Sequence, residues 1–448
     1  MKKYADAKFR SFLNENRGKA RLSSILQLTL YTGLLVKAGI DKPPRCYDER
    51  YSLAYLSLTY SKLMTPDDLI AYMKGLEIYY GLPKGIITSE LIYVLRDADN
   101  KMVESLFAMM GELDIRSSEE LYAFYTNIID TMSLSLGKDD GLLSVNASLS
   151  QLIGALAQAE EGMTLYDGFC GTGRTIHCAD RKCRLYLQDI DILKTPIAAT
   201  MSVIRGCMLE RIGSGDSLMR PLMGNDMRYD RIVSELPLGQ RMSKDYLNDI
   251  CINNQLDSRF CNSDTAPILQ ILDQLAPNGV AVLHINSSLL FKSGKAQYLR
   301  ECLIENNLVD CVIELPTGVV PHTAASTAIM ILKMGRTRKD VLLIDSKEHW
   351  SKNYQGVPQL NNDKLAELVN IYRNWTETEH SGFATSETIL RNEATLTPRQ
   401  YMTTSTDIET VNIERLAKEQ EKQFERLVKL HSDLQMIRRI RDDMEGIK

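Results

Sequence analysis

The chain has 448 residues, of which 44% are hydrophobic and 25% charged, and its formal net charge at pH 7 is −5. That length can fill two or three domains, and no apolar stretch approaches the roughly 18 residues of a membrane-spanning helix. The small acidic excess disfavours a protein that grips DNA unaided, because neutralising phosphates supplies most of the affinity for DNA.

The start of the chain and its cysteines favour a cytoplasmic protein. Residues 1–6 are mostly polar and lack the apolar core of a signal peptide. The nine cysteines are odd in number and scattered, which fits a reducing compartment better than a disulfide framework. His177 and Cys178 lie near Cys183, but no second pair follows at ligand spacing, so we predict no metal site.

Residues 1–137 show helical periodicity almost throughout. Apolar residues recur three and four positions apart, as in Leu22, Ile25 and Leu26, and strand-like runs are scarce. Prolines and glycines separate the helical segments. We predict an all-α N-terminal domain that ends at the linker 136–141.

Beyond the linker, short apolar runs alternate with helical segments. This alternation predicts an α/β domain over residues 138–402, with a sheet covered by helices on both faces and ligands bound at the carboxyl ends of the strands. A helix is expected over 148–157, and strands are expected at 165–167, 185–187, 231–233, 280–283, 311–315, 327–332 and 341–344.

One strand, Leu165 to Asp167, breaks into a glycine turn and then returns to a helical pattern. Gly171 and Gly173 permit positive φ and let a ligand approach the backbone, and a following helix would offer its first N–H groups to an anion. The motif G-x-G-x-x-G is absent because Ile176 stands at its third glycine, which disfavours NAD. The pattern D-x-F-x-G-x-G resembles instead the first motif of methyltransferases that use S-adenosylmethionine (SAM).

Three acidic residues follow strands at spacings that suit a nucleoside cofactor. Asp167 closes the first strand and is expected to orient the glycine turn. Asp189 ends the second strand, where a carboxylate accepts both ribose hydroxyls. Asp216 follows a third, weaker strand and is placed to accept from an adenine amino group. Together with the glycine turn, these acids predict a SAM pocket.

Longer blocks extend the likeness to known proteins. They include G-D-S-L at 215–218, I-E-L-P at 313–316, T-A-I-M-I-L-K at 327–333 and L-T-P-R-x-Y at 396–401. On these motifs, the chain from about Ser144 to Met402 resembles the modification subunits of type I restriction-modification systems, which methylate adenine N6 in DNA.

The resemblance implies a fold, a cofactor and partners. It implies a SAM-dependent methyltransferase (Rossmann-like) sheet, SAM as cofactor, DNA reached through a specificity subunit, and a restriction subunit where the system has one. The residues that match the family's cofactor motifs are Asp167, Gly168, Phe169, Gly171, Thr172, Gly173, Asp189, Asp216 and Ser217.

The main departure falls on the chemistry. Family members carry N-P-P-[FYW] after the fourth strand, where this chain has Glu235, Leu236, Pro237 and Leu238. The asparagine oxygen and the next carbonyl bind the adenine amine as charge develops on it, and the aromatic ring stacks on the flipped base. Glu235 is one methylene longer than asparagine and Leu238 cannot stack, which predicts a rate lower by roughly 10³ to 10⁵.

Smaller departures surround the cofactor motif. Gly168 stands where proline is usual, Arg174 where glycine is usual, and Val145-Asn146 where the family has Thr-Pro. The Arg174 side chain either obstructs the cofactor or pairs with its methionine carboxylate. These changes predict weak SAM binding.

Two functions therefore compete. One is an adenine methyltransferase in which Glu235 replaces the asparagine and another aromatic, such as Tyr246, supplies the stack. The other is an inactive methyltransferase-like scaffold that binds DNA, SAM or partner subunits. Methylation of RNA or protein is a weaker alternative, because the I-E-L-P and L-T-P-R-x-Y blocks are specific to the DNA-modifying subfamily.

The predicted C-terminal segment, residues 403–448, carries a heptad pattern from Asp407 to Gly446, with charged residues on the other faces. Most of the heptad positions are apolar, among them Leu427, Leu430, Leu434 and Ile437. The pattern predicts a C-terminal helix that forms a coiled coil with a partner's helices, which the resemblance assigns to the specificity subunit. The alternative is a helix folded back on its own domain.

Overall fold

A computed structural model describes residues 2–16, 18–133, 146–320, 325–353 and 356–402. Residues 1–402 form one compact unit, and residues 403–448 form a second unit, which lies outside the described residues. The expected C-terminal helix and the boundary at residue 137 also lie outside them, so both stay predictions. Within the described ranges, no helix has the length and apolar character needed to cross a bilayer.

The N-terminal region is helical, as its periodicity predicts. Helix α2 lies at its centre, because Leu26, Leu30 and Leu34 are fully buried and the helix contacts α4, α5 and α7. The helices of this region are α1 (Lys2–Glu15), α2 (Leu22–Asp41), η1 (Glu49–Tyr51), α3 (Leu53–Leu63), α4 (Pro66–Tyr79), α5 (Thr88–Asp97), α6 (Asn100–Gly111) and α7 (Ser118–Ser133).

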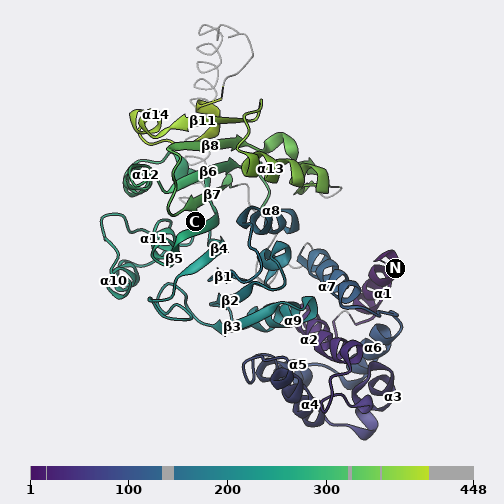
Figure 1. Ribbon diagram of the computed structural model, residues 1–448. Helices are drawn as coiled ribbons and strands as arrows, with labels where there is room; N and C mark the ends of the chain where they lie inside the picture. The colour runs from purple at the N-terminus through teal and green to yellow at the C-terminus, as the bar shows by residue number, and fades with distance from the viewer. Residues whose placement is uncertain (1, 17, 134–145, 321–324, 354–355, 403–448) are drawn as a thin grey trace, which may run out of the picture. The chain divides into compact units, whose positions relative to one another are not determined.

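The rest of the described chain builds a mixed nine-stranded sheet in the order β11-β8-β6-β7-β5-β4-β1-β2-β3 (Figure 1). Strands β1 to β5 are parallel, and β7 runs antiparallel between β5 and β6. The predicted α/β sheet is confirmed. Its strands are β1 (Thr164–Asp167), β2 (Arg184–Asp189), β3 (Met208–Ser214), β4 (Tyr229–Glu235), β5 (Leu275–Asn286), β6 (Val309–Glu314), β7 (Thr327–Lys333), β8 (Asp340–Asp345) and β11 (Ser381–Thr385), and a separate two-stranded sheet joins β9 (Ser351–Lys352) to β10 (Pro358–Gln359).

Alternate residues of the strands pack on opposite faces of the sheet, as the period of two requires. Leu165 and Val233 share one buried cluster with α8, α9 and α13, and Tyr166 and Ile232 share another with α11, α12 and α14. The helices are α8 (Ala147–Ala157), α9 (Thr195–Arg205), α10 (Lys244–Asn253), α11 (Ala266–Asp273), α12 (Lys295–Glu305), α13 (Asn362–Asn374) and α14 (Ser386–Arg391), with short 3-10 helices η3 (Arg174–Cys178), η4 (Ser287–Leu290), η5 (Lys347–His349) and η6 (Pro398–Gln400).

The N-terminal helices and one face of the sheet share a continuous apolar core. Helix α2 packs against α9, and the contact is close at Gly33. A Cβ atom built on Gly33 would lie 2.8 Å from Cδ1 of Ile204 and 3.0 Å from the ring of Tyr125. A side chain at this position would therefore require the Ile204 and Tyr125 side chains to move.

Candidate active site

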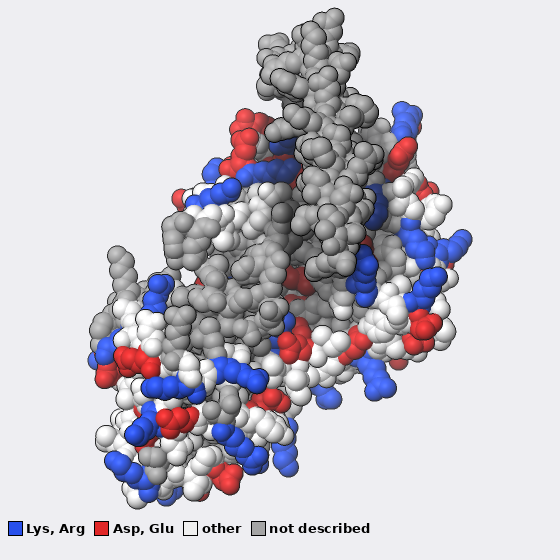
Figure 2. Space-filling view, turned by 180° about the vertical axis from the view of Figure 1, so that it is seen from behind, with Lys and Arg blue, Asp and Glu red and all other residues white. Residues whose placement is uncertain are grey.

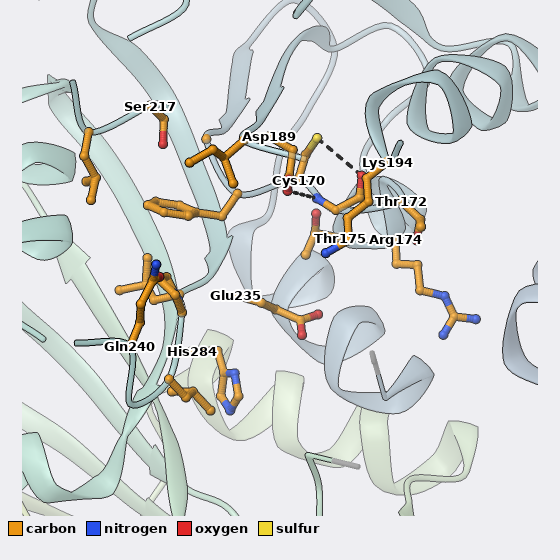
Figure 3. A pocket seen from close by; sticks show the side chains of 18 of the residues that line it. Cys170, Thr172, Arg174, Thr175, Asp189, Lys194, Ser217, Glu235, Gln240 and His284 are labelled. Carbon is orange, nitrogen blue, oxygen red and sulfur yellow. Dashed lines mark hydrogen bonds between the residues drawn. The ribbon is translucent and has the colours of Figure 1, made fainter. Parts of the chain in front are cut away.

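A cavity of about 410 Å³ opens at the carboxyl ends of β1, β2 and β4. The chain order of the strands reverses between β1 and β4, and such reversal points are where sheets of this class bind ligands. Its lining includes every residue predicted for the cofactor or the fourth motif except Asp167 and Gly173. The side chains converge from strand ends and from the glycine turn (Figure 3).

Asp167 lies beneath the cavity and holds the glycine turn. Its Oδ1 accepts hydrogen bonds from the Phe169 N–H at 3.1 Å and the Ser234 hydroxyl at 3.2 Å, and its Oδ2 accepts from Thr175 Oγ1 at 2.5 Å. Complete burial raises the pKa of this carboxyl to about 7, although the three donors favour its ionised form. The predicted role of Asp167 in orienting the turn is therefore seen in its hydrogen bonds.

The turn itself depends on glycine at two positions. Gly171 has φ 53° and donates its N–H to Asp189 Oδ2 at 2.7 Å. Gly173 has φ 81°, and a Cβ there would lie 3.2 Å from Cβ of Ala198 on α9. The first glycine thus connects the turn to the end of β2, and the second lets α9 approach.

Thr172 points to a ligand in this turn. Its hydroxyl is buried and has no hydrogen-bond partner among the described residues, although the residue lines the cavity. An unpaired buried hydroxyl costs free energy that a bound polar group can recover. The donor set of the turn therefore fits a polar cofactor end.

The prediction of a helix after the glycine turn is wrong. Residues Arg174–Cys178 form a five-residue 3-10 helix instead of a longer α-helix. The guanidinium of Arg205, from α9, donates to the carbonyls of Ile176 and Ala179, which a continuing α-helix would need for its own hydrogen bonds. A helix dipole is thus not part of the site.

Arg174 is among the residues that line the cavity, and its guanidinium contacts helix α7. Its guanidinium forms an ion pair with Asp130 on α7 and donates to the Thr126 carbonyl at 3.4 Å. Burial lowers its pKa to about 10. This contact links the turn to α7, and the two expected effects of Arg174 on the cofactor, obstruction or pairing with its carboxylate, stay predictions.

The two other differences from the family's usual residues, at Gly168 and Asn146, have local structural causes. A Cβ at Gly168 would lie 2.7 Å from the hydroxyl oxygen of Tyr166, so the tyrosine occupies the space that a larger residue would need. Asn146 caps α8 by accepting from the N–H groups of Ser148 and Leu149, and its amide donates to the carbonyls of Val319 and Pro358. Asn146 is thus a structural anchor beside the cavity.

Asp216 and Tyr246 form a pair on the cavity wall. Asp216 Oδ1 accepts from the Leu218 N–H at 3.0 Å, and its Oδ2 accepts from the Tyr246 hydroxyl at 2.6 Å. Tyr246 is therefore anchored beside the acid predicted for the cofactor's adenine end.

The fourth-motif segment begins where β4 ends. Glu235 Oε1 accepts from the Ser150 hydroxyl at 2.5 Å, and burial raises the pKa of the Glu235 carboxyl to about 7 against the opposing effects of Ser150 and Arg174. The Leu236 N–H donates to the His284 carbonyl at 3.3 Å, and Pro237 and Leu238 line the cavity.

His284 is a cavity residue that the sequence analysis missed. It lies on β5, is 2% exposed, and its Nε2 has no hydrogen-bond partner among the described residues. Burial lowers its pKa to about 4, so the imidazole is neutral at physiological pH. A single histidine inside the apolar run 280–285 is the only signal that the sequence offers for it.

Comparison with known proteins identifies the family. Residues 117–410 match the family model described as N-6 DNA methylase. The chain belongs to the N-6 DNA methylase family. The resemblance to type I modification subunits, which the sequence motifs predict, is confirmed by relatives and solved structures of that kind.

The curated relatives of this N-6 DNA methylase family member are distant and longer. The methylase subunit of the type I restriction enzyme MpnII from Mycoplasma pneumoniae is 24% identical over 381 residues, which cover 75% of this chain and 66% of that protein. The HindI methylase subunit from Haemophilus influenzae is 26% identical over 153 residues, or 32% of this chain and 34% of that protein. The chain thus spans less than two thirds of either relative.

Solved structures show the same fold. The type I methyltransferase subunit from Streptococcus thermophilus superposes with a TM-score of 0.70 at 17% identity, covering 90% of this chain and all of that one. A modification subunit from Vibrio vulnificus gives a TM-score of 0.62 at 15% identity, covering 87% and 93%. The fold is that of type I methyltransferase subunits.

The raised pKa of Glu235 predicts how stability changes with pH. The folded state holds this proton more tightly than the unfolded chain does, where the pKa is about 4.3. The protonated carboxyl therefore stabilises the fold fully below about pH 4, and this contribution, roughly 4 kcal/mol, is lost as the pH rises through 7. Urea unfolding between pH 4.5 and 8 should show a weaker fall in Glu235→Gln than in the natural protein.

Asp167 titrates in the same direction, so part of the fall should remain in that variant. Glu305→Gln, an exposed change at the end of α12, should leave the pH dependence unaltered. An identical fall in the natural protein and Glu235→Gln would contradict the raised pKa.

Proposed function

We propose that this N-6 DNA methylase family member binds SAM in the cavity and methylates adenine N6 in DNA, at a rate strongly reduced by its fourth motif. The supporting observation is that the glycine turn, Asp189 and residues 235–238 line one cavity at the carboxyl ends of neighbouring strands. This arrangement brings the predicted cofactor residues beside the predicted target residues.

The residues of the cavity fit the cofactor. Its volume lies in the range of small-molecule sites. The Gly171 turn and the unpaired Thr172 hydroxyl suit the polar methionine end, and Asp189 suits the ribose hydroxyls. Asp216 and Ser217, which also line the cavity, would contact the adenine end.

When bound, SAM supplies an activated methyl group. The chain's own contribution is to hold the adenine amine in line with it. Glu235 offers a carboxylate oxygen and Leu236 a backbone carbonyl, but Leu238 gives no aromatic face for the base. A weakly held base reaches the reactive geometry rarely, which reduces the rate.

A scaffold without transfer is the second candidate function. Two properties of Glu235 favour it. Its Oε1 already accepts a hydrogen bond from Ser150, and its carboxyl is about half protonated near neutral pH. A protonated carboxyl is a poorer acceptor for an amine. In this case the cavity would serve to bind SAM or to support partner subunits.

DNA would reach this chain through a specificity subunit, with a restriction subunit where one exists. The chain is acidic overall, and on the face seen in Figure 2 the described Lys and Arg residues are interspersed with Asp and Glu. Such a mixed surface gives little phosphate neutralisation. The specificity subunit would therefore supply much of the affinity for DNA.

The activity is tested in cells. DNA from cells that carry the gene should contain methyladenine at a defined sequence, and deletion of the gene should remove it. Sequencing that detects methyladenine measures the outcome. Methylation that is unchanged by the deletion would refute transfer by this chain, and methylation at ordinary levels would refute the reduced rate.

Calorimetry should show SAM binding to the purified protein, weakened about 30-fold or more by Asp189→Ala. That change removes both the expected ribose contact and the bond that holds the Gly171 N–H, each worth about 1 kcal/mol or more. Asp191→Ala is the matched control, because its carboxylate accepts from the Leu193 N–H and Asp191 does not line the cavity. Absence of heat at millimolar SAM would refute the pocket.

A further inference from the structure

Two residues that each carry an unpaired polar atom are register neighbours near the ends of β4 and β5. Glu235 and His284 are register partners on these parallel strands, so their side chains leave the same face of the sheet. Glu235 Oε1 is bonded to Ser150, and among the described residues its Oε2 has no hydrogen-bond partner. The buried Nε2 of His284 has none either within the described chain.

The two side chains occupy the part of the cavity away from the cofactor residues. Figure 3 shows Asp189 and Ser217 at one end of the view, His284 and Gln240 at the other, and Glu235 between them. A ligand at the His284 end would thus lie beside the cofactor and not on its site. This is the position that a second substrate requires.

The chemistry of the pair defines its ligand. An ionised carboxylate only accepts hydrogen bonds, and a neutral imidazole with its hydrogen on Nε2 donates one. Adenine and cytosine carry an exocyclic amine next to an acceptor ring nitrogen, which matches an acceptor beside a donor. Guanine and thymine carry a carbonyl next to a ring N–H, which is the reverse pattern.

We propose that Glu235 and His284 together read the edge of an amino-bearing nucleobase, with Glu235 Oε2 accepting from the amine and His284 Nε2 donating to the adjacent ring nitrogen. This inference rests on the proposed function, because it names the substrate end of the same site. It assigns His284 as a specificity residue that partly compensates for the missing asparagine of the fourth motif.

The pair is tested by nucleoside binding, without any methyl transfer. Protein labelled with ¹⁵N-histidine is saturated with S-adenosylhomocysteine at pH 8, so that the cofactor site is filled and Glu235 is mostly ionised. Adenosine, inosine and purine riboside are then titrated separately. Adenosine should shift the His284 Nε2 resonance at concentrations at least about tenfold lower than the other two, which lack the amine.

Two variants sharpen the result. In Glu235→Gln the amide can also donate, so inosine should gain affinity and the preference for adenosine should fall to about onefold. In His284→Phe the preference should be lost, which also identifies the His284 resonance among the six histidines. Glu305→Gln, an exposed change at the end of α12, should keep the preference.

Equal affinity for adenosine and inosine in the natural protein, or no shift with adenosine, would overturn the proposal. So would a preference that survives in Glu235→Gln, a variant that keeps the side-chain size if His284→Phe does not fold. These outcomes are separate from the proposed activity. A selective protein that transfers nothing would support the pair and refute methylation, and an active protein without selectivity would do the opposite.

Discussion

Replacing Glu235, Leu236 and Leu238 together with Asn, Pro and Phe is expected to raise the rate of adenine methylation by roughly 10³ to 10⁵. The asparagine returns a neutral acceptor that does not titrate, the proline fixes the φ of the next carbonyl, and the phenylalanine returns a stacking face. The rate is measured as transfer of labelled methyl groups to DNA by the protein with its specificity partner.

The structure indicates one cost of this triple change. The Leu236 N–H donates to the His284 carbonyl at 3.3 Å, and proline removes that donor. The bond is long, so its loss should cost no more than about 1 kcal/mol of stability. Leu238→Phe alone restores only the stacking face and should recover the smaller part of the rate, roughly tenfold to a hundredfold.

An opposite result would be equally informative about Glu235. If the natural protein already methylates DNA at ordinary turnover and the triple variant is slower, Glu235 is a working catalytic residue and the scaffold interpretation fails. Tyr246 is a poor candidate for the missing stack in either case, because its hydroxyl is held by Asp216 beside the cofactor end.

Removing residues 405–448 is expected to abolish copurification with the specificity subunit and to leave the remaining protein folded. Residues 1–402 form a compact unit of their own, so we expect them to fold without the removed segment. The heptad pattern predicts that the segment's apolar seam binds partner helices. Affinity purification of tagged protein measures the first effect, and the urea midpoint measures the second.

Point substitutions distinguish binding through the apolar seam from a requirement of the complex for the segment as a whole. Leu430→Asp with Leu434→Asp places charge on the predicted seam and should break the complex, whereas Lys429→Glu with Gln435→Glu lies off the seam and should preserve it. Complex formation that survives the deletion would reject the seam and favour a helix folded back on its own unit.

The sequence predicted the meeting of Asp167, Asp189 and the glycine turn because one physical rule suffices. Parallel strands end at the same edge of a sheet, so residues that directly follow such strands come together whatever the loops do. The structure confirms that juxtaposition, and Asp189 even accepts from the Gly171 N–H. The roles of these residues toward SAM remain predictions.

The features of the site that the sequence did not predict depend on contacts between distant parts of the chain. The helix expected after the turn is cut short by Arg205, and Arg174 is engaged by Asp130 on α7. Neither partner can be identified from local spacing. His284 was missed for a related reason, because a histidine in an apolar strand is informative only when the neighbouring strand is known to place Glu235 beside it.

The close contact of α2 with α9 has a consequence for how the chain is made. The ribosome releases Gly33 well before it synthesises Ile204, and at about 5–20 residues per second the delay is roughly 8–30 s. During that interval the part of α2 that α9 will cover faces water or a chaperone. Newly made N-terminal helices should therefore be vulnerable to aggregation until the first two strands and α9 have emerged, and fragments that end before residue 195 should accumulate poorly in cells.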